Sequence, residues 1–331
     1  MRGAAGWLIL SLVWTMSSEP NSFAGPPTFQ STDRARGSGT DSTSVFKRTR
    51  AEDQFEFETE QMEGSVRLSG PYHGVSRLVD KRTGIQVIDT RYSALNLFKL
   101  MSVNQCMGQP RSMERTTTVG DRWLEIHWSS TPSHLADVTA RYELAAANAI
   151  DLTVTVRANS SYRAYELFLS NYFDKRLRPH VYLWSRNRRQ GDLVLPMVND
   201  TFRGTVLVFP RDSHAARHCL DGRWDRRENS TPVVQMCPLR HYVHCLGFLV
   251  DEDSRLAVLL MSRPTDCYAI STRYFAEDDA DRLTTYSAFD LSLFGNDLVP
   301  GANRAVKVRL ALTELDSAWS QPVSSYKSFV E

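Results

Sequence analysis

The sequence predicts an all-β protein in which antiparallel sheets pack face to face as a sandwich, with a dozen or more strands and one or two short helices. The dominant hydrophobic period is two rather than 3.6, as expected for strands with one buried face. At least a dozen such segments are separated by short polar turns. Strands that do not alternate with helices argue against a doubly wound sheet and favour stacked antiparallel sheets.

The clearest strand is "AIDLTVTVRA", in which four apolar residues alternate with polar ones: Ile150, Leu152, Val154 and Val156. The same alternation begins in "QFEFETE" and continues through "RWLEIHWSS", "DVTARYEL", "YVHCLGFLV", "RLAVLLMSR" and "AVKVRLALTEL". Two segments favour helices instead, Ala94–Met107 and the C-terminal Asp316–Phe329. Asp316 can cap the second helix, whose apolar residues recur at helical spacing.

The N-terminus has the pattern of a secretory signal peptide: Arg2, an apolar run from Ala4 to Met16, then small residues up to Ala24. The run is shorter than the roughly 20 apolar residues of a membrane span. We expect a signal peptide at 1–24, a disordered Ser/Thr/Gly/Arg-rich leader at 25–53 and a single β-sandwich domain at 54–331. The mature protein is therefore expected to be secreted or periplasmic, without a membrane span; an uncleaved anchor is the alternative.

The composition limits the classes of partner and cofactor that we expect for this protein. Lys and Arg total 39 against 38 Asp and Glu, so no basic field is expected to attract nucleic acid. The 42% hydrophobic and 10% aromatic content is ample for a full core. No phosphate-binding glycine loop, G-x-S-x-G elbow or dinucleotide fingerprint occurs, and we expect no cofactor.

Five cysteines are present, an odd number that leaves at least one outside any disulfide. Cysteines that lie near one another in an exported protein are typically paired. We therefore predict a disulfide between Cys219 and Cys237, which would close a loop of modest length. Cys245 and Cys267 lie on segments that could be neighbouring strands, so a second bridge between them is conceivable.

A metal site is the competing interpretation of "HAARHC" at 214–219 and "CPLRHYVHC" at 237–245. Their His and Cys spacings resemble zinc-ligand spacings only loosely. A strand through the second segment would place His244 and Cys245 on opposite faces, where they cannot share an ion. We expect no metal site.

The segments "SGPYHGVSRLVDKRTGIQVID", "RWLEIHWSS" and "DVTARYELAAANAIDLTVTVRANSS", in this order and followed by a β-rich tail, resemble the β-supersandwich domains of the galactose-mutarotase-like superfamily. The resemblance covers roughly 54–315. That superfamily includes aldose epimerases, domains of polysaccharide lyases and glycoside hydrolases, and uncharacterised exported bacterial proteins. The resemblance implies a concave sheet that faces a carbohydrate. No Asn-His-Pro-type signature is present, and His73 and Glu166 match the family's acid and base only by their order.

Three residues are candidates for acid–base catalysis. Glu166 shares a strand face with Phe168 and Tyr172, where a carboxylate can act as a general base with a raised pKa. His127 shares a face with a glutamate two residues earlier, and His73 lies in the turn "GPYHG". Each also fits an ordinary strand edge or turn. Catalysis would require Glu166 within about 5–8 Å of one of these histidines.

Two arginine-rich loops are candidates for substrate binding. "WSRNRRQ" contains Trp184 and Arg186, and "DGRWDRRENS" contains Trp224 and Arg226. A tryptophan face stacks on a pyranose ring, and an arginine fork binds carboxylates. These loops would suit an acidic sugar such as a uronate; the alternative is that they are solvated connections.

Together these features indicate an exported protein that binds or processes a carbohydrate. Enzymatic activity stays open; it would be acid–base chemistry on a glycan, of the epimerase, lyase or hydrolase type. The alternative is a non-catalytic structural or protein-interaction domain of the cell envelope, in which the candidate residues are scattered.

Overall fold

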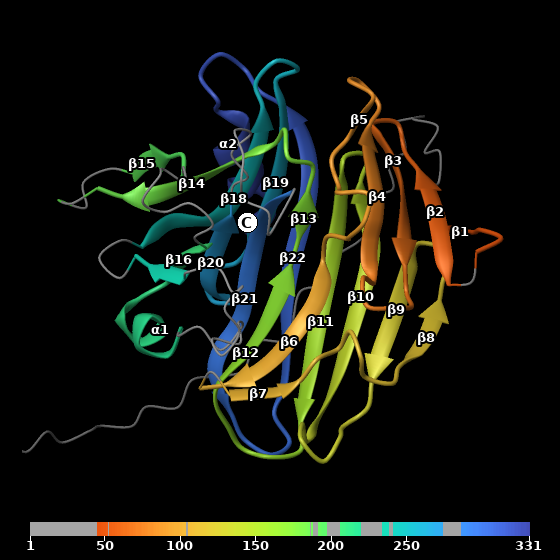
Figure 1. Cartoon of the computed structure of the whole chain (residues 1–331), viewed down its shortest axis with the longest axis vertical. Helices are drawn as coiled ribbons and strands as arrows, with labels where there is room; N and C mark the ends of the chain where they lie inside the picture. Colours follow the sequence, from red (N-terminus) through yellow and green to blue (C-terminus); the bar gives the residue numbers. More distant parts are fainter. Residues whose placement is uncertain are drawn as a thin grey trace, which may run out of the picture. The chain divides into compact units, whose positions relative to one another are not determined.

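The computed structural model describes residues 45–51, 53–103, 105–185, 187, 191–196, 206–219, 234–237, 241–273 and 286–331. In these residues the strands form three sheets (Figure 1). Every strand pair is antiparallel except β16 (Val206–Pro210) with β17 (Val234–Met236). The all-β antiparallel class predicted from the sequence is confirmed.

The five-stranded sheet is a meander that follows the order of the chain: β1 (Lys47–Arg48), β2 (Gln54–Glu58), β3 (Met62–Arg67), β4 (Gly74–Asp80) and β5 (Ile85–Gln86). In β2, Phe55 and Phe57 are buried while Glu56 and Glu58, which alternate with them, are exposed, as the alternation predicts. Phe46, before β1, is also buried in the main core, so packing begins upstream of residue 54.

The nine-stranded sheet has the spatial order β15 (Gly191–Val194), β14 (Arg178–Trp184), β18 (Tyr242–Asp251), β19 (Leu256–Ser262), β22 (Asn303–Glu314), β11 (Ala149–Ala158), β10 (Ala136–Ala146), β9 (Trp123–Trp128) and β8 (Thr116–Val119). In β11, Leu152 lies between Tyr142 of β10 and Val308 of β22, and all three are fully buried. The predicted alternation of this strand is confirmed.

The eight-stranded sheet has the order β17, β16, β20 (Cys267–Arg273), β21 (Ser287–Leu298), β12 (Tyr162–Ser170), β6 (Asn96–Ser102) and β7 (Gln105–Gly108), with β13 (Tyr172–Phe173) pairing to β21. The helix predicted over 94–107 is wrong, because this segment forms β6 and β7. Leu97 and Leu100 both face the core and pair with β12 across a register shift. That bulge leaves them three residues apart on one face, which mimics helical spacing.

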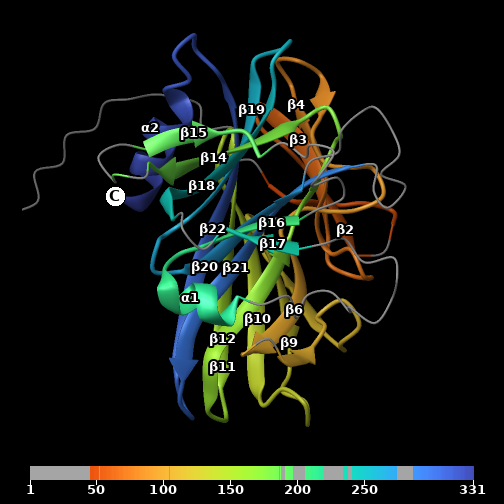
Figure 2. The same cartoon turned by 60° about the vertical axis from the view of Figure 1, so that its left-hand side comes forward.

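Two helices accompany the sheets. The predicted C-terminal helix is present as α2 (Gln321–Val330), and it packs Tyr326 and Phe329 into the core. Asp316 accepts backbone N–H groups in the turn that precedes it. The short α1 (Ser213–His218) lies beside β16 (Figures 1 and 2). Within the described residues, neither helix has the length and apolar character that a membrane crossing requires.

The three sheets share one core. The five-stranded sheet meets the segment before β6 through a backbone bridge between Val75 and Ala94. From the nine-stranded sheet, the Tyr142 hydroxyl donates to the Leu95 carbonyl at 2.9 Å. The loop between β2 and β3 contacts the β10–β11 turn, where the Thr59 hydroxyl donates to the Ala147 carbonyl at 2.5 Å. The main apolar cluster therefore runs through all three sheets.

Candidate functional site

The outward face of the eight-stranded sheet carries buried polar side chains. Along β12, Leu167 and Leu169 point into the core, so the residues between them point away from it. Six polar residues of this outward face are nevertheless at most 7% exposed: Glu166, Ser170, Ser271, Arg273, Asp290 and Ser292. The face of a sandwich that points away from the core is ordinarily solvated. A buried polar face of this kind marks a candidate site.

Four half-buried tyrosines gather at one end of this face: Tyr72, Tyr92, Tyr172 and Tyr286, here named the tyrosine cluster. Their ring centroids are 4.8 Å apart for Tyr92 and Tyr172 and 4.9 Å apart for Tyr172 and Tyr286. Tyr72 lies 5.0 Å from Tyr92. The four come from separate segments: the turn before β4, the loop before β6, β13 and the residue directly before β21. The fold thus assembles an aromatic surface that no single segment contains.

Arg111 connects the tyrosine cluster to the sheet. Its Nε donates to Asn96 Oδ1 at 2.7 Å, and its Nη2 donates to Ser170 Oγ and to the Tyr172 hydroxyl, both at 2.9 Å. The guanidinium carbon also lies 4.0 Å from the ring centre of Phe98 and 4.8 Å from that of Tyr72. All these partners are neutral. Within the described residues no carboxylate pairs with this half-buried charge.

Behind Arg111, a second arginine and a histidine support its position. Arg115 Nη2 donates to the Arg111 carbonyl at 2.9 Å, and burial lowers the pKa of Arg115. His73 is fully buried beside Trp128, and its Nε2 accepts the Leu97 N–H at 3.1 Å. Burial, and then the positive charges of the two arginines, hold the pKa of His73 well below its ordinary value. A neutral His73 therefore anchors the start of β6, which carries Asn96.

Asp290 supplies a negative charge close to two tyrosines of the cluster, Tyr172 and Tyr286. Its Oδ1 accepts the Asn171 N–H at 2.9 Å, and Ser271 Oγ lies 3.5 Å from its Oδ2. Burial raises the pKa of Tyr172 while Arg111 opposes the rise and Asp290 adds to it. Burial likewise raises the pKa of Tyr286. Both phenols thus stay protonated and can donate to a ligand at neutral pH.

The structure brings Glu166 to this face but separates it from the two predicted histidines. Glu166 lies four residues before Ser170 on β12, about 13 Å away at the spacing of a strand. His73 lies beside the core. His127 lies on the outward face of the nine-stranded sheet, where its Nδ1 is 3.2 Å from Thr139 Oγ1. These three residues do not form one acid–base site.

Of the predicted sugar-binding residues, Trp184 ends β14, and its N–H donates to the His241 carbonyl at 2.9 Å. Arg186, Trp224 and Arg226 lie outside the described residues. The predicted role of these two Trp- and Arg-containing loops in sugar binding therefore stays a prediction.

Arg111, Asp290 and the tyrosine cluster were not identified from the sequence. The available signal was weak: tyrosines in the turns "GPYHG" and "TRYS", and a tyrosine directly after the β12 strand. None of these has a local spacing that predicts a site, because the contacts join separate segments of the chain, such as those of Tyr92 and Tyr286.

The predicted disulfide is not formed: in the described residues no disulfide joins Cys219 to Cys237. Cys219 instead ends α1, with its N–H bonded to the Ala215 carbonyl at 2.6 Å and its side chain buried against Val206 and Val208. His244 packs on Tyr182 and Tyr326 while Cys245 is buried in the core, which agrees with the predicted opposite faces. No group of three or more metal-ligating side chains converges in the described part of the chain.

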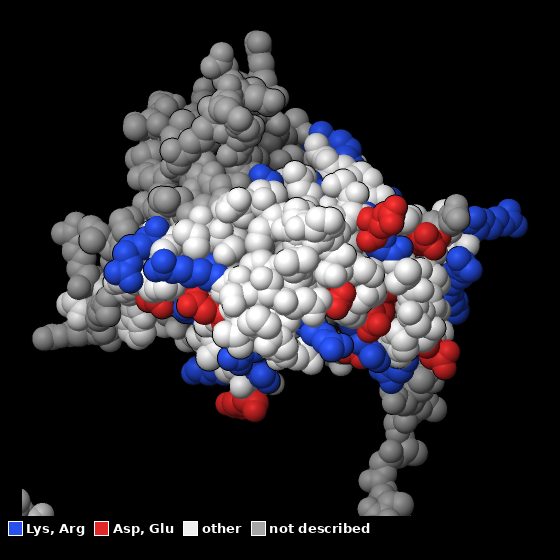
Figure 3. Space-filling view, turned by 90° about the horizontal axis from the view of Figure 1, so that it is seen from below, with Lys and Arg blue, Asp and Glu red and all other residues white. Residues whose placement is uncertain are grey.

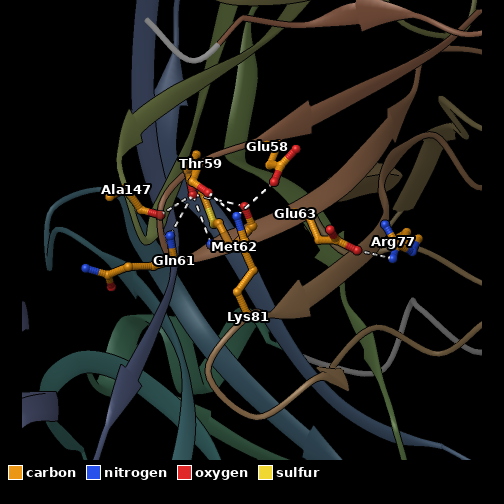
Figure 4. Close-up of polar contacts among 8 residues, drawn as sticks. All are labelled: Glu58, Thr59, Gln61, Met62, Glu63, Arg77, Lys81 and Ala147. Carbon is orange, nitrogen blue, oxygen red and sulfur yellow. Dashed lines mark hydrogen bonds and ion pairs between the residues drawn. The ribbon is translucent and has the colours of Figure 1, made fainter. Parts of the chain in front are cut away.

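A hollow of about 570 Å³ on the five-stranded sheet offers a contrast to this site. Arg77 there pairs with Glu63, and Lys81 pairs with Glu58 at 2.8 Å (Figure 4). Cations and carboxylates are likewise interspersed on the face seen from below (Figure 3). Neutralised surface pairs of this kind indicate a solvated surface, whereas the described part of the chain gives Arg111 no such partner.

No protein-family model matches the sequence, and no curated protein matches it.

The fold is that of a large antiparallel β-sandwich, and solved structures similar to it were found. One is the Slr1438 protein of Synechocystis sp. PCC 6803, with a TM-score of 0.48, 10% identity, and 78% of this chain and 96% of the other covered. Another is a putative aldose 1-epimerase of Escherichia coli K12, with a TM-score of 0.45 and 11% identity over 79% of this chain and 100% of that one. A heparan sulfate lyase HepC mutant of Pedobacter heparinus gives a TM-score of 0.43 and 8% identity over 82% of this chain and 36% of that one. These structures include a putative aldose 1-epimerase, one of the kinds of protein that the sequence resembles.

Proposed function

We propose that the outward face of the eight-stranded sheet binds a saccharide that carries an acidic group. The observation that carries the proposal is the half-buried guanidinium of Arg111, which lies among aromatic rings without a carboxylate partner in the described residues. Arginine has five N–H donors, and the protein engages Nε and Nη2. Nη1 stays available to a carboxylate or sulfate, which the planar guanidinium fork matches.

The tyrosine cluster supports a sugar rather than a bare anion as the ligand. Aromatic rings offer flat apolar surfaces to the C–H faces of a pyranose, and phenol hydroxyls offer hydrogen bonds to its oxygens. Tyr92, Tyr172 and Tyr286 meet within 5.2 Å of one another and stay half-exposed. A saccharide with its acidic group toward Arg111 would cover these rings.

Acid–base chemistry on the bound saccharide would fall to Tyr172 and Asp290. The Tyr172 hydroxyl accepts an N–H from Arg111, so its own proton is available to a ligand oxygen. Asp290, held by the Asn171 N–H, is the neighbouring acceptor. If the bound glycan is chemically altered over time, the protein processes it; if the glycan is unchanged, the protein only binds it.

The test is a glycan array that presents neutral, uronate-containing and sulfated saccharides, followed by calorimetric titration of the full chain. We expect acidic saccharides to bind better than neutral ones of the same backbone, and Arg111→Gln to lose this preference. Arg141→Gln is the matched control, because Arg141 also covers an aromatic ring, Trp123 at 4.2 Å, but lies on the nine-stranded sheet. A folded protein that binds no glycan would refute the proposal and favour the interaction-domain alternative.

We also propose that the protein is exported, on the basis of the apolar N-terminal run and the small residues that follow it. The mass and first residue of the protein recovered from its source cells test this. Cleavage after Ala24 in the secreted or periplasmic fraction is expected. An intact N-terminus in the cytosolic fraction would contradict export.

A further inference from the structure

Two cysteines flank the corner at which the chain passes from one large sheet to the other. β19 of the nine-stranded sheet ends at Ser262, and β20 of the eight-stranded sheet begins at Cys267. Between them, the N–H groups of Asp266 and Cys267 both donate to the Arg263 carbonyl, at 3.0 and 3.2 Å. In the neighbouring strand, Leu246 pairs with Met261, so Cys245 lies beside Ser262, the last residue before the corner.

Both thiols are fully buried in the same core. The two side chains are 0% exposed, and the Cys267 thiol adds to burial in raising the pKa of the Cys245 thiol. Tyr242, from the strand of Cys245, brings its hydroxyl 3.7 Å from Cys267 Sγ and donates to the Cys267 carbonyl at 3.4 Å. The ends of β18 and β20 are therefore already in contact at this point.

We propose that Cys245 and Cys267 form a disulfide that joins the two large sheets when the protein folds under oxidising conditions. The S–S bond forms as the two thiols together lose two protons and two electrons. A small disulfide such as glutathione disulfide accepts both: its own S–S bond breaks, and it leaves as two thiols. In the present structure both cysteines are in the thiol form.

The timing of this reaction follows from burial. Thiolates, not thiols, carry out disulfide exchange, and burial raises the pKa of the Cys245 thiol in the folded chain. The bond is therefore expected to form while the chain folds, and to resist reductants once it is enclosed. It would fix the first residue of β20, the strand that carries Ser271 and Arg273 to the candidate site.

The experiment is to unfold the full chain with reductant, refold it in a mixture of reduced and oxidised glutathione, and block remaining thiols under denaturing conditions. We expect three of the five cysteines to be blocked and the tryptic peptides 241–255 and 256–273 to be linked. Cys106→Ser, which changes an exposed cysteine, is expected to keep this link, and Cys245→Ser to abolish it.

The linked protein should also melt about 5–10 °C above the same protein refolded with reductant alone, as expected for a loop of this length in a chain of this size. Comparison within one sequence avoids reliance on a variant that fails to fold. Five blocked cysteines after oxidative refolding, or a link between Cys219 and Cys237 in place of this one, would overturn the proposal.

Discussion

The outward faces of the two large sheets follow the same alternation but differ in the state of their polar residues. On the nine-stranded sheet, Arg141 pairs with Glu143 at 3.2 Å, and both side chains are 38% exposed. Beside the eight-stranded sheet, the partners to which Arg111 donates in the described residues are neutral oxygens, among them that of the buried Ser170. At Arg141 the nine-stranded face is paired and half-exposed, whereas at Arg111 the eight-stranded face gives the charge no carboxylate partner among the described residues.

This difference shows that period-two alternation identifies the outward face of a strand but does not indicate whether that face is solvated or binds a ligand. A desolvated charge without a partner costs free energy. Such unfavourable charges are found mainly at functional sites, because a bound ligand can supply the missing counter-charge. The comparison therefore supports the proposal that the face with Arg111 binds a ligand, and this proposal can be tested at several residues.

The largest effect is expected from pH, because buried histidines contact the eight-stranded sheet. Burial lowers the pKa of His134, whose Nε2 lies 3.0 Å from the Tyr165 hydroxyl, from 6.5 to about 4. Between these values the unfolded chain binds a proton that the folded chain does not, so stability falls as pH falls. The difference between the two pKa values corresponds to about 3 kcal/mol in the free energy of unfolding from His134 alone. Urea unfolding at pH values between about 4 and 7 measures it.

The pH dependence has its own control. His134→Gln should flatten the profile by about 1.4 kcal/mol per pH unit in this range, even if it lowers stability at every pH. His73 should add to the same trend, because burial also holds its pKa well below the ordinary value. A profile unaffected by His134→Gln would mean that this ring titrates equally in both states.

A somewhat smaller effect is expected from Asp151, the buried carboxylate of the nine-stranded sheet. Its side chain is 5% exposed and bonds to Arg309 at 2.6 Å and to Lys307 at 3.3 Å. Asp151→Ala should lower the free energy of unfolding by about 2–3 kcal/mol, because it removes the partner of two half-exposed cations. Glu143→Gln, at an exposed pair, should cost less than about 1 kcal/mol. Equal losses would show that burial does not distinguish the two pairs.

The fold was predictable from the sequence where the signal is local. In β11 every second residue is apolar and buried, so alternation alone defines its faces. The segment at 94–107 failed because a bulge in β6 gives Leu97 and Leu100 a helix-like spacing. Only the pairing of that strand with β12, some 70 residues away, overrides this local pattern.

The candidate site was less predictable. The alternation of β12 gave the correct outward face for Glu166, but Arg111 and Asp290 become neighbours of Tyr172 only when separate strands pair. The predicted Cys219–Cys237 bond rested on proximity along the chain. The sequence made a bridge between Cys245 and Cys267 conceivable on neighbouring strands, whereas the structure places them in two different sheets, on either side of a corner of the chain.

The next prediction concerns Arg111, through ligand binding. Arg111→Gln should weaken binding of an acidic saccharide by about 10- to 100-fold, the usual worth of a hydrogen bond to a charged group. Arg111→Lys keeps the charge but loses the planar fork, so it should lie between the wild type and Arg111→Gln. Calorimetric titration gives the three dissociation constants. Equal weakening for acidic and neutral saccharides would assign Arg111 to the shape of the site and not to the acidic group.

The smallest effect is expected from the tyrosine cluster. Tyr92→Ala should weaken saccharide binding by about 3- to 10-fold, because it removes one aromatic surface among several. Tyr92→Phe should have less effect if the ring is what the sugar contacts. Trp123→Ala, on the opposite sheet, is the control and should leave binding unchanged. If Phe and Ala at position 92 weaken binding equally, the hydroxyl is the contact. The cluster would then recognise its ligand by hydrogen bonds rather than by stacking.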